Sequence, residues 1–349
     1  MKSLFYYLKQ ILPGLLLVSI MCSCSKNDDL QQSGDTATLS LNIPMLQAQS
    51  RGTIEGTDKE NAIYNLRVVI LSQGAESINK AFSQTELASG TVTIDNVPVG
   101  LVQMYVIANE AALGKNYTDL NVLRDEAITV NGKRKVLIKD EYRTHFPKKG
   151  SEFALENNKP ETAKGLPMSW MEQFTVNPPS ESPQTVTVNL QRCVAKLKII
   201  MQSTLSEDIL IKEMNFGEFF GDRLFLFQEK ELNLDVPDDA LYGKKDYTGL
   251  DITIPANEEK VLECYIYPSF AWKDETKPSP YTIGFKTSKS GVEHTYTPQS
   301  FIYQGAALNS IARNTQVNIT AKLSKPANVN ISFEVVPWTN ETINVPTFK

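Results

Sequence analysis

Short segments rich in β-branched and aromatic residues recur along this 349-residue chain, and turn residues separate them. Strict alternation in Val186-Thr187-Val188-Asn189-Leu190 puts the apolar side chains on one face of a half-buried strand. Proline, glycine and asparagine mark turns at 96–100, 177–180 and 325–328. The pattern predicts an all-β chain of antiparallel β-sandwiches. The predicted strands include residues 62–71, 91–97, 103–108, 185–190, 194–201, 261–267 and 315–323.

Helices should be few and short, and residues 118–125 and 304–310 are the best candidates. A Pro/Ser-rich stretch at 177–183 separates a more irregular half from a half richer in regular strands. This length suits two domains of ordinary size. We therefore predict a domain boundary between residues 178 and 179.

The N-terminal residues indicate export. Lys2 and Lys9 are followed by an apolar stretch at 11–21, which is too short to cross a bilayer. The sequence Met21-Cys22-Ser23-Cys24 is typical of a lipoprotein signal, in which the chain is cut before a cysteine that is then acylated. Cys24 fits better than Cys22 because the small residue Ser23 precedes it. We expect residues 1–23 to be the signal peptide; the alternative is an ordinary secretory signal.

Charge and cysteine content limit the partners. The chain carries 35 Lys+Arg and 40 Asp+Glu, so it lacks the basic excess that would hold nucleic acid. Beyond the signal region only Cys193 and Cys264 remain, each in an apolar strand. Buried free thiols are expected there rather than a disulfide.

Catalytic and metal-binding motifs are scarce, so we expect neither an enzyme nor a cofactor. His145 and His294 are the only histidines, too few for a multi-histidine metal site. Asp235, Asp238 and Asp239 are interpreted as a solvated turn rather than a calcium site. A carboxylate pair for glycoside hydrolysis stays open on sequence alone, although the 3 tryptophans form no evident sugar-binding cluster.

Two alternating segments lie near the ends of the mature chain. Near the N-terminus, Leu39, Leu41 and Ile43 share one face, and the polar stretch that follows contains Arg51-Gly52, a good protease target. Near the C-terminus the alternation returns twice, around a turn at 337–340, and this pattern predicts a hairpin. The C-terminal apolar positions are Val329, Ile331, Phe333, Val335, Ile343 and Val345.

Several stretches resemble the fimbrillins, the subunits of the Bacteroidetes surface pili called type V. Their order and spacing carry the likeness from the lipoprotein signal to the C-terminus. The stretches are residues 60–70, 97–100, 106–110, 166–169, 190–197 and 313–338.

The resemblance implies two transthyretin-like β-sandwiches in tandem, at 52–178 and 179–325. It also implies a lipid on Cys24, a propeptide at 24–51 whose strand is removed by an arginine-specific protease at Arg51-Gly52, and a donor-strand hairpin at 326–349. That hairpin would fill the groove of a neighbouring subunit, whereas the alternative is two ordinary strands of the chain's own sheet.

The implied function is that of a fimbrial shaft or accessory stalk subunit, first held on the extracellular face of the outer membrane by its lipid. The implied partners are other fimbrial subunits, and a ligand on a host or bacterial surface is left open. A fimbrial tip adhesin is the alternative within the family, and a surface glycan-binding lipoprotein is the alternative outside it.

Overall fold

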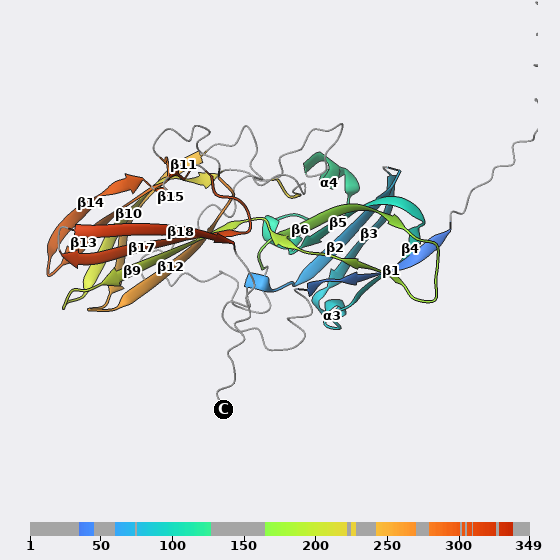
Figure 1. Cartoon of the computed structure of the whole chain (residues 1–349), viewed down its shortest axis with the longest axis horizontal. Coiled ribbons are helices and arrows are strands. Elements are labelled where there is room, and N and C mark those ends of the chain that lie inside the picture. Colours follow the sequence, from blue (N-terminus) through green and yellow to red (C-terminus); the bar gives the residue numbers. More distant parts are fainter. Residues whose placement is uncertain are drawn as a thin grey trace, which may run out of the picture. The chain divides into compact units, whose positions relative to one another are not determined.

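A computed structural model of the chain describes residues 35–44, 60–73, 75–126, 165–221, 225–227, 242–269, 279–300, 302–303, 306–308, 310–325 and 328–337. This part is almost entirely β, as the sequence predicts (Figure 1). Its strands are β1 (Thr36–Asn42), β2 (Asn65–Ser72), β3 (Ala75–Ser83), β4 (Val92–Pro98), β5 (Gly100–Ala108), β6 (Met168–Val176), β7 (Gln184–Thr187), β8 (Gln191–Arg192), β9 (Ala195–Ser203), β10 (Ile209–Gly221), β11 (Tyr242–Ile254), β12 (Glu259–Ile266), β13 (Thr282–Lys289), β14 (Val292–Ser300), β15 (Ile302–Tyr303), β16 (Ala306–Ala307), β17 (Thr315–Lys325) and β18 (Asn328–Pro337). Its short helices include α3 (Gln84–Leu87), the 3₁₀ turn η2 (Glu110–Leu113) and α4 (Leu120–Glu126).

The strands form two sandwiches, each with its own buried apolar cluster. In the first sandwich, the sheets β4-β1-β7 and β3-β2-β5-β6-β8 share one cluster. In the second, the sheets β12-β9-β17-β18 and β11-β10-β13-β14 share the other. Most pairs are antiparallel, but β7 runs parallel to β1, and β17 runs parallel to β9.

The same strand order occurs twice along the chain. The strands β1 to β6 correspond in order to β9 to β14, and β7 corresponds to β17. With this correspondence, every pair of neighbouring strands among the first seven recurs in the second sandwich. The parallel or antiparallel sense of each matched pair is also preserved. Relative to this shared seven-strand order, β18 is an additional strand at the edge beside β17.

Asn109 connects the elements around the first core. It is fully buried with φ 60°, and its side-chain amide donates to the carbonyl oxygens of Ala62 and Leu166, each at 2.8 Å. Its Oδ1 accepts from the Tyr64 N–H at 2.9 Å. Gly165 makes room for this side chain, because an added Cβ there would lie 2.8 Å from Asn109 Cγ. One polar side chain thus satisfies backbone groups at the starts of two strands.

The helix predictions are partly correct. Residues 118–125 contain most of α4, as expected. The helix at 304–310 is wrong, because Ala306–Ala307 forms β16 and pairs with β15. Helix α3 was not predicted, although Ser83 and Glu86 form a capping box at its start.

The first buried cluster continues past the Pro/Ser-rich stretch. Residues 177–183 connect β6 to β7, and the first cluster continues through Cys193 and Val194. The second cluster begins at Ala195. The first cluster also includes Leu226, Phe227, Tyr265 and Tyr267, so the two clusters do not divide at a single point of the chain. The domain boundary between residues 178 and 179 stays a prediction. Cys193 and Cys264 are both buried free thiols, as expected.

Candidate site of strand exchange

Strand β1 is the centre of its sheet. It pairs antiparallel with β4, from Thr36 opposite Pro98 to Leu41 opposite Val92, and parallel with β7. The Val188 N–H extends the second pairing by donating to the Asn42 carbonyl oxygen at 2.8 Å. Both backbone edges of β1 are therefore used, and its removal would separate β4 from β7.

The two faces of β1 differ as the alternation predicts. Leu39 and Leu41 on β1, and Ile43 just after it, are 0–1% exposed in the first core. On the other face, the Thr38 hydroxyl donates to Asp95 Oδ1 at 2.9 Å at an exposed position. A register shift between Ala37 and Leu39 interrupts the pairing with β4. β1 thus contributes an apolar stripe to the core although it lies at the start of the described chain.

The walls beside β1 are also apolar. Val92, Ile94 and Val97 on β4 are buried, as are Val186 on β7 and Val188 just after it. Sequence reasoning predicted both wall segments as strands but did not assign them to the site. Their alternation carries no sign of which strand lies between them, because that depends on contacts between distant segments. Without β1, these side chains would line an exposed apolar groove.

A pocket of about 430 Å³ lies where β1 begins. Thr36, Ala37 and Thr38 form one wall, and the Pro/Ser-rich connection 177–184 forms the other. Gln184 joins the two ends of this connection. Its side chain accepts from the Asn177 N–H at 2.8 Å and donates to the Thr175 carbonyl oxygen at 3.0 Å.

Four of the six residues predicted to belong to the donor hairpin lie on β18. The register sets Val329, Ile331, Phe333 and Val335 opposite residues 323, 321, 319 and 317 of β17. In this structure β18 is thus an edge strand of the chain's own sheet (Figure 1). Ile343, Val345, Cys24, Arg51 and Gly52 lie outside the described residues.

Among the described residues, no group of three or more His, Cys, Asp and Glu side chains is placed to hold a metal ion. Trp170 lies half-buried on β6, and His294 lies on β14. No helix in the described ranges is long and apolar enough to cross a membrane.

Solved structures with a similar fold include two fimbrial proteins. A fimbrilin (fimA) from Porphyromonas gingivalis W83 is 14% identical, with a TM-score of 0.52 over 87% of this chain and 98% of that one. The tip fimbrial protein Mfa3 from Porphyromonas gingivalis, with a C-terminal truncation, is 14% identical, with a TM-score of 0.51 over 87% of this chain and 100% of that one. At this identity the likeness shows the fold alone.

Sequence comparison adds the family. No curated protein matches the chain. The family model described as "Fimbrillin-A associated anchor proteins Mfa1 and Mfa2" matches residues 32–344, which is nearly the whole sequence. Its match begins just before β1 and continues beyond β18. The chain therefore belongs to this family of structural fimbrial subunits, the fimbrillin-A associated anchor proteins Mfa1 and Mfa2.

Proposed function

We propose that this fimbrial subunit polymerises by strand exchange, in which β1 leaves the first sandwich and a strand from a neighbouring subunit takes its place. The central position of β1, with a buried apolar face and two paired edges, carries the proposal. An extended strand that enters the vacated groove would recover the backbone hydrogen bonds on both sides. Alternating side chains would set its register.

The apolar stripe of β1 is large enough to make exchange selective. Burial of Leu39, Leu41 and Ile43 contributes roughly 1.5–3 kcal/mol each, or about 4.5–9 kcal/mol before ordering costs. A groove emptied of this stripe would favour any strand with matching apolar positions. In the precursor, the tethered β1 occupies the groove first. Cleavage at Arg51-Gly52 by an arginine-specific protease ends that tether.

Strand β18 is the donor that we propose. It is 10 residues long, compared with 7 for β1, and it has four apolar positions at two-residue spacing. The repeated strand order supports this role, because the second sandwich keeps the seven strands that both sandwiches share when β18 leaves. Residues 338–349, with Ile343 and Val345, would extend the donor beyond β18.

We further propose that the precursor reaches the outer face of the outer membrane as a lipoprotein acylated on Cys24. The fimbrial family fits a cell-surface location. Lipid attachment before residue 35 would leave the first sandwich and its groove outside the membrane. Shaft or accessory stalk is the position that uses both a removable strand and a donor; a tip adhesin would accept a donor without donating.

An anchor is a second candidate, favoured by the description of the matching family. An anchor keeps its lipid and β1, so its groove stays closed, and the fimbria grows from its donor strand alone. The two roles therefore predict different N-termini on the same surface-exposed protein.

We expect surface-extracted protein to begin at Gly52, because only a cleaved subunit can accept a neighbour. Intact-mass and N-terminal peptide mass spectrometry measure this directly. Acylated Cys24 as the sole N-terminus, in protein that still assembles, would assign the chain as an anchor instead. The Cys24→Ala variant serves as the control, since it should lose acylation and most surface antigen.

A further inference from the structure

A buried polar cluster joins the first sandwich to the second. We call it the junction cluster and define it as Glu60, Arg192, Lys196, Tyr265 and Arg313, whose exposed fractions range from 1% to 7%. Glu60 precedes β2 and Arg192 lies on β8, both in the first sandwich. Lys196 on β9, Tyr265 on β12 and Arg313 before β17 belong to the second.

Glu60 is the acceptor at one end of the cluster. Its Oε1 lies 2.6 Å from Lys196 Nζ and also accepts from the Tyr265 hydroxyl. Lys196 Nζ also lies 2.9 Å from Glu263 Oε1, which is partly exposed. Burial raises the pKa of Tyr265, and the charge of Glu60 raises it further, so the phenol stays a donor. The ion pair links the segment before β2 with β9, and the Tyr265 hydrogen bond links it with β12.

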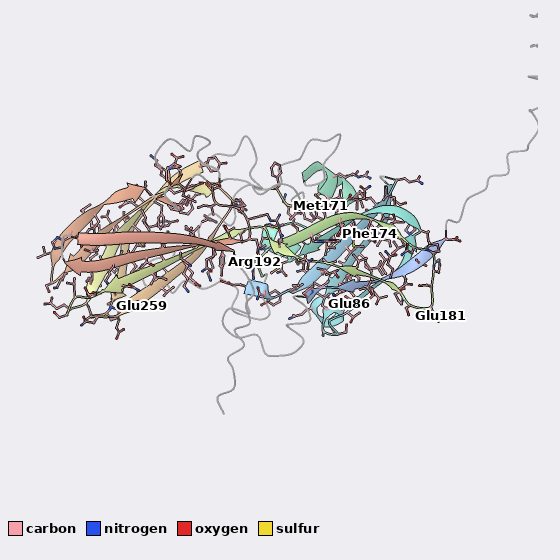
Figure 2. All side chains as sticks on the ribbon, in the orientation of Figure 1. Glu86, Met171, Phe174, Glu181, Arg192 and Glu259 are labelled. Carbon is pink, nitrogen blue, oxygen red and sulfur yellow. The ribbon has the colours of Figure 1, made fainter. Side chains whose placement is uncertain are left out.

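Arg192, which is labelled in Figure 2, also forms hydrogen bonds to residues of both sandwiches. Its Nε donates to the Glu60 carbonyl oxygen at 3.2 Å, its Nη1 to Asn314 Oδ1 at 3.1 Å, and its Nη2 to Asn61 Oδ1. Burial lowers the pKa of Arg192 to about 10, against the opposing effect of the Glu60 charge. Desolvation therefore disfavours the charged form of this guanidinium. The hydrogen bonds to these three acceptors offset that cost.

Arg313 completes the connection. Its guanidinium donates to the carbonyl oxygens of Leu226 and Gln191, each at 2.8 Å, and of Arg192 at 3.1 Å. It also donates to Ser169 Oγ at 2.9 Å and Cys193 Sγ at 3.3 Å. One side chain from the start of β17 thus contacts β6, β8 and the segment 225–227.

The cluster also accounts for motifs that strand exchange does not use. Glu60, Ser169, Arg192, Lys196 and Arg313 all belong to stretches that carry the fimbrillin resemblance. Buried ion pairs add little net stability, but removal of one partner is costly, so they favour one arrangement of the elements around them. The observations thus indicate a role in holding two bodies together rather than in stabilising either one.

We propose that the junction cluster couples the two sandwiches, so that they open and unfold as a single cooperative unit. The coupling is distinct from strand exchange and does not depend on it. Glu60 lies only eight residues beyond the predicted cleavage bond. If that bond is cut, the junction cluster would hold Glu60 in place while β1 departs; this consequence alone rests on the proposed function.

The test compares two double variants of the full chain. Glu60→Met/Lys196→Met removes both charges of the junction ion pair. Lys212→Met/Asp251→Asn is the control, because its Nζ–Oδ1 distance is also 2.6 Å but both side chains are 25–30% exposed within the second sandwich. Asn is used at position 251 because Asp251 has φ 49°, a conformation that Asn tolerates and Met does not. Calorimetry should give one transition for the wild type and the control, and two for the junction variant, separated by more than about 5 °C.

Cysteine labelling in dilute urea gives a local measurement. Cys193 contacts Arg313 at the junction, whereas Cys264 is fully buried in the second core, where burial raises its thiol pKa and keeps it unreactive until the core opens. Peptide mass spectrometry measures the modification of each thiol over time. In the wild type and the control, both thiols should be modified at the same rate. In the junction variant Cys193 should react at least about 10-fold faster than Cys264.

Glu60→Gln decides the matter if the double variant does not fold. It keeps the shape of the side chain and the Tyr265 hydrogen bond but removes the charge, and Cys193 should again react several-fold faster than Cys264. Equal labelling rates and a single transition in the folded junction variants would overturn the proposal. Two transitions in the wild type would also overturn it. Polymerisation is not measured, so these outcomes are independent of strand exchange.

Discussion

The Arg51→Ala precursor is expected to stay monomeric when an arginine-specific protease converts the wild type into polymer. An intact tether gives β1 an effective concentration of about 1 mM, whereas a neighbour's donor in a 1–10 µM solution is roughly 100–1,000-fold more dilute. β1 should therefore occupy the groove in every uncut molecule. Size-exclusion chromatography and negative-stain microscopy after protease treatment measure the difference, and mass spectrometry confirms Gly52 as the new N-terminus.

Arg124→Ala is the matched control, since it removes another arginine, on α4, that is not part of the proposed cleavage bond. It should polymerise like the wild type. Polymer formation by Arg51→Ala at the wild-type rate would refute release of β1 by this cleavage. Failure of the cut wild type to polymerise would instead show that cleavage alone is insufficient for exchange.

Phe333→Asp is expected to abolish donation, because a carboxylate would enter the apolar groove without a partner. The cost of a buried, unpaired charge is several kcal/mol, so extension should slow by more than about 100-fold. Ser332→Asp adds the same charge at the neighbouring position of β18, which the register assigns to the opposite face, and should extend normally. Circular dichroism of both variants checks that the subunits remain folded.

Mixing separates donor from acceptor. Under the proposed mechanism, uncut Arg51→Ala would keep a donor but a closed groove, whereas cut Phe333→Asp would have an open groove but a defective donor. Together they should form dimers and nothing longer. Long polymers from the mixture, or from cut Phe333→Asp alone, would exclude β18 as the donor.

Local alternation was sufficient to predict most strands. In β1, in residues 186–190 and in β17 the apolar residues recur every second position, and their buried faces follow that period. The helix prediction at 304–310 was wrong because Ala306-Ala307-Leu308 has high helix propensity. Pairing of Ala306–Ala307 with β15 outweighs that propensity. Short strands that depend on one partner are not visible in a local pattern.

The stripe of the candidate site could be predicted, but not its surroundings. Leu39, Leu41 and Ile43 were identified from spacing, and all three are buried. The position of β1 between β4 and β7 could not be inferred, since β7 lies more than 140 residues further along the chain. For the same reason, Arg192 and Arg313 gave no local sign of their role: they meet only through contacts about 120 residues apart in sequence.

The repeated strand order has a consequence for the length of the assembled fibre. β9 holds in the second sandwich the place that β1 holds in the first, but the chain continues from β8 into β9 and on into β10, so one cut near the N-terminus can free only β1. If exchange occurs as proposed, each cut subunit is a bifunctional monomer with one acceptor end and one donor end. Such monomers grow into unbranched chains, and any subunit that lacks either end acts as a chain stopper. Mean fibre length would then follow from the molar ratio of stoppers to bifunctional subunits, as in a step-growth polymer. A separate length-regulating protein would not be needed.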